Sequence, residues 1–586
     1  FYVHLNQWAI AGENQVRVIA RNADQPNCRW YAGAGIYRPV KLHFLPQNSL
    51  CLNGVKIRTV DYQKREMEVC FSADGTPSHK VQFSVSDGEN ILFKSAVNTG
   101  MPIRFCLDNA NLWSIENPFL YTLNVECGED VRTLKFGIRQ VSVSAKKGFL
   151  LNGERVILQG ACIHSDQGLL GAAAHPFADR RKIELIKNAG YNAIRSAHNP
   201  CSKATLDACD ELGVLVLDEY TDGWYIHKTR YDYADYIMDW WQRDLKDMVD
   251  KDYNHPSVVM YSIGNEVAET SQNRGVEFCA QMCEYLHILD ERPVTCGINI
   301  FFNFLFSLGF GVYSEKKAEQ GQKVGSAFFN NLAGIFGDKT MKLGAALPPC
   351  DAKCKQAFEK LDVAGYNYGI NRYRGDLKKY PERIILGSET FCKDAYRFYE
   401  LAKTHPALIG DFVWAGIDYL GEVGIGAWEY RTYAKDFRPV VGWMSAGSGR
   451  IDLVGRQLGE SLYTQVAFEQ AIIKMAVVPV NDYHKPHSPS AWKMSNAIES
   501  WSWKGCEGKK TCVEVYARAH AVQLLLNGVP VGKKKIKGDC KTKFSVRYQS
   551  GTLTAVALDK EGNVLAKTSL SGAEGAPQLH TMPEMN

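Results

Sequence analysis

The sequence VVMYSIGNE, residues 258–266, indicates a buried strand that ends in polar side chains. An uninterrupted run of apolar and small residues before a Gly-Asn-Glu ending suits a strand buried on both faces of a parallel sheet. The sequence IILGSE, residues 384–389, repeats this pattern with an apolar run, a glycine and a final glutamate. In an eight-stranded β/α barrel, the carboxyl ends of the strands form the active-site face. The two stretches therefore predict that Glu266 and Glu389 lie on one face of a barrel.

From residue 156 onward, apolar strands alternate with amphipathic helices such as residues 179–190, which is typical of a parallel sheet. Eight such strands have short connections for the most part, which favours a closed (β/α)8 TIM barrel with a catalytic domain spanning residues 143–475. The predicted strands are residues 156–161, 193–198, 214–219, 258–266, 294–299, 363–368, 384–389 and 408–416.

One connection, residues 300–361, is much longer than the others. We expect a packed helical insertion at the barrel mouth, because its apolar residues follow helical spacing. A mobile lid or a partner contact is the alternative, since long loops inside compact domains are often functional. The apolar residues with helical spacing are Phe328, Phe329, Leu332, Ile335 and Phe336.

Period-2 alternation and regular turn signals before and after the barrel predict β-sandwiches. Residues 46–142 and 488–572 are each expected to form an immunoglobulin-like domain, the second with hairpin turns at Asn527-Gly528 and Ser550-Gly551. We interpret Lys533, Lys534 and Lys535 as a solvated edge strand rather than a nucleic-acid patch. The fold class is therefore a multidomain combination of β and α/β domains.

Residues 1–45 contain short apolar runs at 15–20 and 40–45 that predict two or three strands. These are too few to close a sandwich. We expect the chain to open in the middle of a β domain, so that residues 1–45 are the incomplete end of a jelly-roll sandwich.

The composition is that of a globular protein, with 45% hydrophobic residues and 11% aromatic residues. A net charge of +4 from 68 basic and 64 acidic residues gives no electrostatic reason to expect nucleic acid or membrane partners. No apolar run is long enough to predict a membrane-spanning helix. No Gly-rich phosphate loop follows a strand in the right context, and the chemistry is expected to need no cofactor.

The 17 cysteines are scattered through the chain. The closest spacings, Cys279 with Cys283 and Cys350 with Cys354, have no second Cys or His pair nearby, so that no zinc site is predicted. Free buried thiols in a reducing cytoplasm are the expected state, and they indicate a cytoplasmic location.

Two carboxylates that meet at one face of a barrel suit glycoside hydrolysis. The alternative for each glutamate is a cap on the following helix, and the repeated strand-Gly-X-Glu pattern disfavours it. Six motifs along the chain are RWYAGAGIYR (29–38), LWSIENPFLY (112–121), RSAHNP (195–200), IGNE (263–266), GSET (387–390) and DFVWAG (411–416). Together they resemble glycoside hydrolase family 2, the family of the β-galactosidases and β-glucuronidases, with the bacterial β-galactosidase-like branch as the nearest. Family members begin with a complete jelly-roll domain, and only its last third is matched here, which suggests a chain truncated at its N-terminus.

The resemblance implies a retaining mechanism with Glu266 as the acid/base and Glu389 as the nucleophile. Glu266 is expected to have a raised pKa and Glu389 to stay ionised. The resemblance also implies that Tyr368 supports the nucleophile and that Asn265 binds the sugar 2-hydroxyl.

The remaining substrate contacts are expected at other strand ends of the same face. His164 and Asp166 follow the first strand and His198 follows the second, while Trp414 ends the eighth and would stack on the sugar ring. A lone histidine is usually structural, which is the alternative for the two histidines, and a core tyrosine is the alternative for Tyr368.

Specificity separates the β-galactosidases from the β-glucuronidases of this family. The Asn-X-Lys motif that binds a uronate is replaced here by Ser448-Gly449-Arg450, so a neutral β-galactoside is the first expectation. Arg450 acting as a carboxylate fork leaves β-glucuronides and β-galacturonides open, with a surface arginine as the alternative.

A non-catalytic carbohydrate-binding protein on the same fold is a second class of function, and inverting hydrolysis is a further option. The expected partner is a carbohydrate or glycoconjugate. Homo-oligomers are common in the family, and the state of this chain stays open, as do peripheral metal or other ligand sites.

Overall fold

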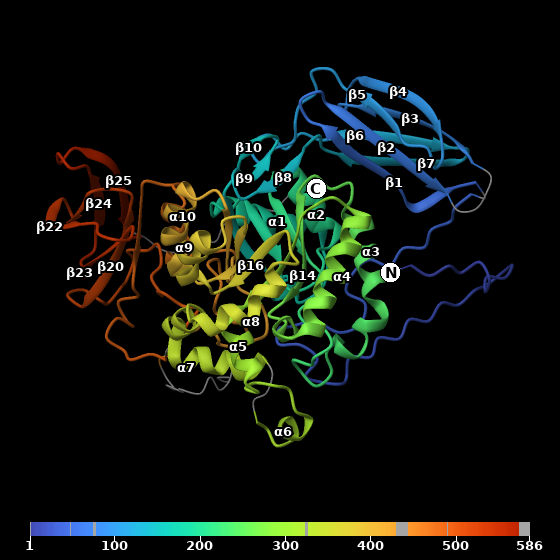
Figure 1. The fold of residues 1–586 in the computed structure, drawn as a ribbon. Helices are drawn as coiled ribbons and strands as arrows, with labels where there is room; N and C mark the ends of the chain where they lie inside the picture. Colours follow the sequence, from blue (N-terminus) through green and yellow to red (C-terminus); the bar gives the residue numbers. More distant parts are fainter. Residues whose placement is uncertain are drawn as a thin grey trace. The chain divides into compact units, whose positions relative to one another are not determined.

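A computed structural model describes residues 2–46, 48–73, 78–322, 326–428, 430, 444–488 and 490–573, and its fold is drawn in Figure 1. The chain divides into two compact units. The first comprises residues 1–456 and 488–493, and the second comprises 457–487 and 494–586. We found no helix among the described residues that is long and apolar enough to span a membrane.

The first unit contains a closed parallel barrel in which β18 pairs with β11, so that no edge is left open. Every residue of its strands is buried, because the barrel core covers one face and helices cover the other. All eight strands predicted from the sequence are present. They are β11 (Leu158–Ile163), β12 (Ala193–Ser196), β13 (Leu215–Glu219), β14 (Val258–Asn265), β15 (Val294–Asn299), β16 (Val363–Asn367), β17 (Ile385–Thr390) and β18 (Leu408–Val413).

Helices alternate with these strands in the order expected of a β/α barrel (Figure 1). They are α1 (Pro176–Asn188), α2 (Lys203–Leu212), α3 (Ile237–Asp252), α4 (Asn273–Leu289), α9 (Ile370–Lys379) and α10 (Ala395–Thr404).

The long insertion between β15 and β16 is helical, as its apolar spacing predicted. The side chains of Ile335 and Phe336, two of the residues with that spacing, lie outside the described residues. Within the insertion, the rings of Phe302 and Phe329 stack on each other. Gly337 interrupts the longest helix with a φ of 72°. The helices are α5 (Ile300–Ser307), α6 (Glu315–Glu319), α7 (Ser326–Ala345) and α8 (Pro348–Phe358).

A β-sandwich precedes the barrel within the first unit. One sheet has the order β1-β2-β5 and the other β4-β3-β6-β7, and alternate residues of β2 and β3 are buried between them. A small sheet of β8 to β10 follows. The strands are β1 (Leu50–Asp61), β2 (Glu66–Ala73), β3 (Lys80–Ser86), β4 (Ile91–Asn98), β5 (Ile103–Cys106), β6 (Tyr121–Cys127), β7 (Asp130–Phe136), β8 (Val141–Ser144), β9 (Gly148–Leu151) and β10 (Glu154–Arg155).

The strands predicted at 15–20 and 40–45 are wrong. Residues 2–46, as far as the structure describes them, form no strand ladder, and the apolar side chains of residues 15–20 and 40–45 are exposed, as Phe44 is by 87%. Alternating apolar residues can form a strand only beside a second strand that accepts and donates its backbone hydrogen bonds. The segment instead makes one isolated antiparallel bridge, between Trp30 and Gly421.

The second unit is a β-sandwich with sheet orders β19-β20-β23 and β22-β21-β24-β25. Its boundaries differ from the predicted ones, because α11 and β19 precede residue 488 and β19 pairs with β20 to complete the core. Its elements are α11 (Gly459–Ala467), β19 (Ile473–Val477), β20 (Lys510–Ala517), β21 (Ala521–Leu526), β22 (Val529–Lys535), β23 (Lys541–Arg547), β24 (Thr552–Leu558) and β25 (Val564–Ser571).

The turn at Asn527-Gly528 joins β21 to β22 with φ values of 53° and 80°, which confirms the predicted hairpin. Lys533 to Lys535 end β22, an edge strand of its sheet, as expected. The turn at Ser550-Gly551 does not close a hairpin, because β23 pairs with β20 while β24 pairs with β21.

Candidate active site

Two glutamates meet in a pocket at the carboxyl ends of the barrel strands. Glu266 directly follows β14, and Glu389 lies near the end of β17. Both line a pocket of about 340 Å³ together with aromatic and apolar side chains. The described lining residues are Arg29, His198, Glu266, Phe302, Asn330, Met341, Tyr368, Glu389, Trp414, Glu422, Ile425 and Trp492.

The side-chain amide of Asn367, at the end of β16, bridges the two glutamates. Its Nδ2 lies 3.4 Å from Glu266 Oε1 and 3.4 Å from Glu389 Oε2. The two carboxylate oxygens are therefore separated by no more than twice that distance. Asn299 Nδ2, at the end of β15, also donates to Glu266 Oε1 at 2.8 Å. Two amides thus fix the orientation of the Glu266 carboxylate.

Glu389 is buried and accepts hydrogen bonds at both oxygens. Tyr368 donates its hydroxyl to Oε1, and Arg195 Nη1 donates to Oε2 at 3.0 Å. Trp492 Nε1 donates to the Tyr368 hydroxyl at 2.8 Å, which orients that hydroxyl toward Glu389.

Burial and then the nearby charge of Glu266 raise the pKa of Glu389, and Arg195 and Tyr368 oppose this shift. The net direction is opposite to the one expected of an ionised nucleophile. The sequence prediction considered the chemistry of the residue and not its burial.

A hydrogen-bonded network joins His198, which lines the pocket, to three buried residues, Asn265, Glu219 and Arg195. Arg195 donates to Glu219 Oε2 at 2.7 Å and to Asn265 Oδ1 at 2.9 Å. Asn265 Nδ2 lies 3.2 Å from His198 Nε2, and Glu219 Oε1 lies 2.6 Å from His198 Nδ1. The amide donor assigns the proton of His198 to Nδ1, facing the carboxylate. Burial opposes ionisation of Glu219, yet Arg195 and His198 lower its pKa.

Arg195, Asn367 and Trp492 were not singled out from the sequence. The first two lie inside the predicted strands 193–198 and 363–368, so that their positions were predicted without their contacts. Trp492 lies in residues 488–493, which belong to the first unit although the sequence placed them in the second sandwich.

Trp414 lines the pocket at the end of β18, as expected. His198 stacks on one face of the indole, with ring centroids 5.3 Å apart and planes within 7°. Trp30 packs edge-on against His198 at 5.3 Å. A sugar has access to Trp414 only where the His198 ring does not cover it.

Arg29 reaches the pocket from the N-terminal segment. Glu422 donates its backbone N–H to the Arg29 carbonyl at 3.1 Å, beside the bridge between Trp30 and Gly421. The Arg29 guanidinium donates to Asp222 Oδ1 at 3.1 Å. Glu422 accepts from Asn330 Nδ2 of α7 at 2.9 Å. An arginine and a third acid therefore border the pocket on segments that the sequence did not assign to it.

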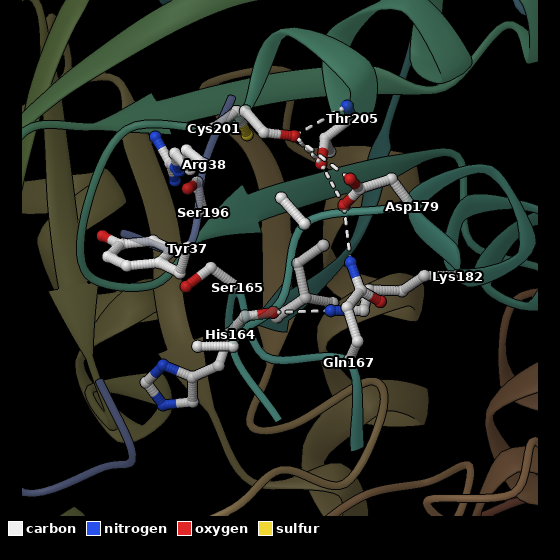
Figure 2. A pocket seen from close by; sticks show the side chains of 14 residues that line it. Tyr37, Arg38, His164, Ser165, Gln167, Asp179, Lys182, Ser196, Cys201 and Thr205 are labelled. Carbon is white, nitrogen blue, oxygen red and sulfur yellow. Dashed lines mark hydrogen bonds between the residues drawn. The ribbon is translucent and has the colours of Figure 1, made fainter. Parts of the chain in front are cut away.

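His164 and Asp166 lie outside the set that lines this pocket. His164 belongs to a neighbouring pocket with Arg38, Asp179 and Thr205, and Figure 2 shows its ring pointing away from the last two. The ring packs on Trp30 with centroids 5.0 Å apart. Burial lowers the pKa of His164 well below its usual value.

Asp166 is buried and accepts the backbone N–H of Gly168 at 3.0 Å and of Leu420 at 3.4 Å. These bonds connect the loop after β11 with the loop after β18. They give the carboxylate a structural task, which the sequence prediction of a sugar contact did not consider.

Arg450 also lies outside the residues that line the pocket. Its guanidinium is fully buried and donates to the backbone carbonyls of Trp414, Ser448 and Trp492 at 2.7–3.0 Å. The interpretation as a surface arginine is therefore wrong, whereas the uronate fork stays a prediction that these contacts do not favour. A guanidinium that satisfies three buried carbonyls holds loops together instead.

A closed β/α barrel with two convergent glutamates at its carboxyl face, joined to β-sandwich domains, defines a glycoside hydrolase. Family models agree with this class. Residues 53–139 match "Glycosyl hydrolases family 2", and residues 141–323 match "Glycosyl hydrolases family 2, TIM barrel domain". Residues 508–566 match a domain of unknown function, DUF4982.

The chain belongs to glycoside hydrolase family 2. A solved family 2 member from Bacteroides cellulosilyticus is 32% identical, with a TM-score of 0.77 over 94% of this chain and 68% of that one. Beta-galactosidase BoGH2A of Bacteroides ovatus is 28% identical over 97% of this chain. A putative beta-glucuronidase of Formosa agariphila is 28% identical over 99%. The chain spans 69% and 54% of the length of these two relatives.

Proposed function

We propose that the protein is a retaining exo-β-glycosidase that acts on β-galactosides. The observation that carries the proposal is the shared contact of Glu266 and Glu389 with the Asn367 amide. The two 3.4 Å contacts place one oxygen of each carboxylate no more than twice that distance apart. This upper limit admits the separation of about 5–5.5 Å between the carboxyl groups of retaining enzymes and leaves out most of the range of about 6.5–9.5 Å of inverting enzymes.

The surroundings of the two glutamates support different roles. Glu389 lies deeper, is held by Tyr368 and Arg195, and faces the site as a fixed nucleophile. Glu266 is the more exposed of the two, which suits a group that exchanges protons with a leaving group and with water.

The reaction follows in two displacements. Glu389 attacks the anomeric carbon while Glu266 gives its proton to the glycosidic oxygen, so that this bond breaks and a glycosyl ester forms. Water then attacks the same carbon and gives its proton to Glu266. The ester bond to Glu389 breaks, both residues return to their first states, and the sugar leaves with its β configuration. Asn265, which is hydrogen-bonded to Arg195 and His198, would hold the sugar 2-hydroxyl in both transition states.

Charge around the pocket supports a neutral sugar. Three acids, Glu266, Glu389 and Glu422, line it, while Arg29 is the cation among the described lining residues and is paired with Asp222. A uronate carboxylate entering this pocket would add a further negative charge without a free cation in the described lining to bind it.

A panel of chromogenic β-galactoside, β-glucuronide, β-galacturonide and β-glucoside substrates tests the proposal. We expect the highest kcat/KM for the β-galactoside. A higher kcat/KM for either uronide would reverse the choice of sugar. Binding of galactosides without hydrolysis of any substrate by the full-length protein would favour the non-catalytic alternative.

A further inference from the structure

Three potential metal ligands meet at the amino-terminal face of the barrel, opposite the catalytic face. Cys283 and His287 lie on α4, and Asp362 directly precedes β16. One ligand atom of each residue lies within 4.8 Å of the other two. We propose that these three residues, named the α4 cluster here, bind a zinc ion. The proposal is independent of the glycosidase activity.

The helix positions two of the ligands. Residues four apart on an α-helix lie on the same face, one turn from each other, so that Cys283 and His287 point to the same side of α4. Pairs with this spacing bind zinc on helices in known metal sites. The α4 cluster therefore has two donors in place as soon as the helix forms.

Backbone contacts hold the third ligand. Asp362 Oδ2 accepts the backbone N–H of Val294 at 2.7 Å, which ties it to the start of β15. The same oxygen lies 2.9 Å from His287 Nε2. The carboxylate is thus fixed beside the helix, and little side-chain order has to be gained on binding.

The donor set suits zinc. A thiolate sulfur, an imidazole nitrogen and a carboxylate oxygen are the ligands that Zn²⁺ binds at about 2.0–2.3 Å in tetrahedral sites. The side chains of His287 and Asp362 are 37% and 35% exposed, so that water has access as a fourth ligand. Binding replaces the thiol proton of Cys283 with the metal ion and releases that proton to solvent.

The position indicates what the ion would do. Val294 and Asp362 stand at the starts of β15 and β16, which are the strands on either side of the helical insertion. A metal at Asp362 would join α4 to the point where the chain returns from the insertion to the barrel. The amino-terminal face of such barrels serves stability rather than catalysis. The α4 cluster is therefore expected to stabilise the fold.

The sequence predicted no zinc site, because the spacing of Cys279 and Cys283 has no second Cys or His pair nearby. The second ligand beside Cys283 is the single histidine His287, and the third, Asp362, lies 75 residues after His287. Only the strand order of the barrel brings Asp362 beside α4.

Metal binding by the full chain tests the proposal directly. The reduced protein is stripped with a chelator and dialysed against buffered Zn²⁺, and bound metal is measured per chain. His287→Ala is the main variant, because the side chain is partly exposed and its loss leaves the helix intact. We expect it to bind one zinc equivalent less than the unmodified protein, and we expect Zn²⁺ to raise the Tm of the unmodified protein only.

Cobalt(II) supplies a signature that identifies the thiol. The unmodified protein and Cys279→Ala, a matched control one turn away on α4, should show a thiolate-to-cobalt charge-transfer band, and Cys283→Ala should lack it. Equal zinc content in the unmodified protein and His287→Ala would overturn the proposal. So would a cobalt band that persists in Cys283→Ala, because another cysteine would then be the ligand.

Discussion

Glu389 must be ionised to attack a sugar, yet its surroundings raise its pKa above the usual value of a glutamate. Burial and the charge of Glu266 raise its pKa, and the charge of Arg195 and the hydrogen bond from Tyr368 act in the opposite sense. The residue is therefore a base whose ionisation depends on two specific neighbours. Changing either neighbour should change the pH dependence of the reaction.

Tyr368→Phe removes the hydroxyl that donates to Glu389 Oε1 and leaves the ring in place. The pKa of Glu389 then rises further, because one of the contacts that lowers it is lost. Activity depends on the ionised form and is lost as the pH falls through this pKa, so the acidic limb of the kcat/KM profile moves to higher pH. A hydrogen bond to a charged group contributes about 1.5–3 kcal/mol, and we expect kcat/KM to fall by about tenfold to 100-fold.

Tyr366→Phe is the matched control for this prediction. Tyr366 lies on β16, two residues before Tyr368, and its buried hydroxyl donates to Asp376 at 2.7 Å, away from the pocket. Its loss should affect stability without moving the acidic limb. An unchanged limb in Tyr368→Phe would show that the hydroxyl does not control the ionisation of Glu389.

Glu389→Gln should abolish turnover and raise the thermal stability of the protein. A carboxyl whose pKa is raised by folding binds protons more tightly in the native state, so that stability falls as the pH rises from the unfolded pKa through the folded one. Each pKa unit of that shift lowers the free energy of unfolding at high pH by about 1.4 kcal/mol. The amide that replaces this carboxyl does not ionise, so the variant escapes this loss of stability. We expect a higher Tm than that of the unmodified protein at pH 7 and a smaller difference near pH 4.

Glu219→Gln should change the thermal stability in the opposite direction. Its pKa is lowered by Arg195 and His198 against the effect of burial, so that its ionised form stabilises the fold above the unfolded pKa. We expect a lower Tm at pH 7. Thermal scans of both variants at two pH values check the pair, and a lower Tm for Glu389→Gln at pH 7 would contradict the account.

The sequence predicted the two reacting carboxylates better than the residues that form hydrogen bonds with them. Glu266 and Glu389 were found because each ends an apolar strand of a barrel, where side chains meet on one face. Arg195 and Asn367 lie on strands predicted in the right places, but a fully buried charge is not recognisable from a pattern of apolar residues. Their roles follow from partners on other strands, which only the closed barrel brings together.

Among the elements, the bridge between Trp30 and Gly421 determines where Arg29 lies. Gly421 has a φ of 86°, and a Cβ at this position would lie 2.6 Å from the Tyr31 backbone nitrogen. Gly421→Ala should push the N-terminal segment away and displace Arg29 from the pocket. Misplacement of a binding group by about 1 Å can cost on the order of 100-fold in rate. We expect a loss of kcat/KM within that range.

Gly424→Ala separates the steric effect from backbone strain. Gly424 also has a positive φ, of 77°, but nothing lies within 4 Å of its added Cβ. Both variants should lose some stability, since L-residues avoid this conformation. Steady-state kinetics should show a clear loss only for Gly421→Ala, and equal losses in the two would argue against a role for the bridge.

Helices and strands were predicted correctly where the sequence pattern also indicates which elements pack beside them. A continuous apolar strand followed by an amphipathic helix implies a parallel sheet, and all eight barrel strands were predicted. Residues 15–20 and 40–45 have the alternation of a strand but no partner among the described residues. Alternation indicates a face to be buried and says nothing about what covers it. The contact of Arg29 with the pocket could not be predicted for the same reason.

The division of the chain into two units was only partly predictable. Residues 488–493 leave the second unit and return to the first, where Trp492 donates to Tyr368. Neither turn residues nor hydrophobic period distinguish such an excursion from an ordinary loop. Net charge is similarly uninformative about the pocket, since a chain with a formal charge of +4 has three acids lining its candidate active site.

The proposed mechanism requires a covalent glycosyl ester on Glu389, and peptide mass spectrometry tests for this ester most directly. The protein is incubated with a 2-deoxy-2-fluoro glycoside that carries a good leaving group and the sugar preferred in the substrate panel, so that the ester forms faster than it hydrolyses. We predict one glycosyl group per chain, on the peptide that contains Glu389, with release of one equivalent of leaving group. A glycosyl group on a different residue, or steady turnover that releases the α-anomer without any covalent adduct, would contradict the account.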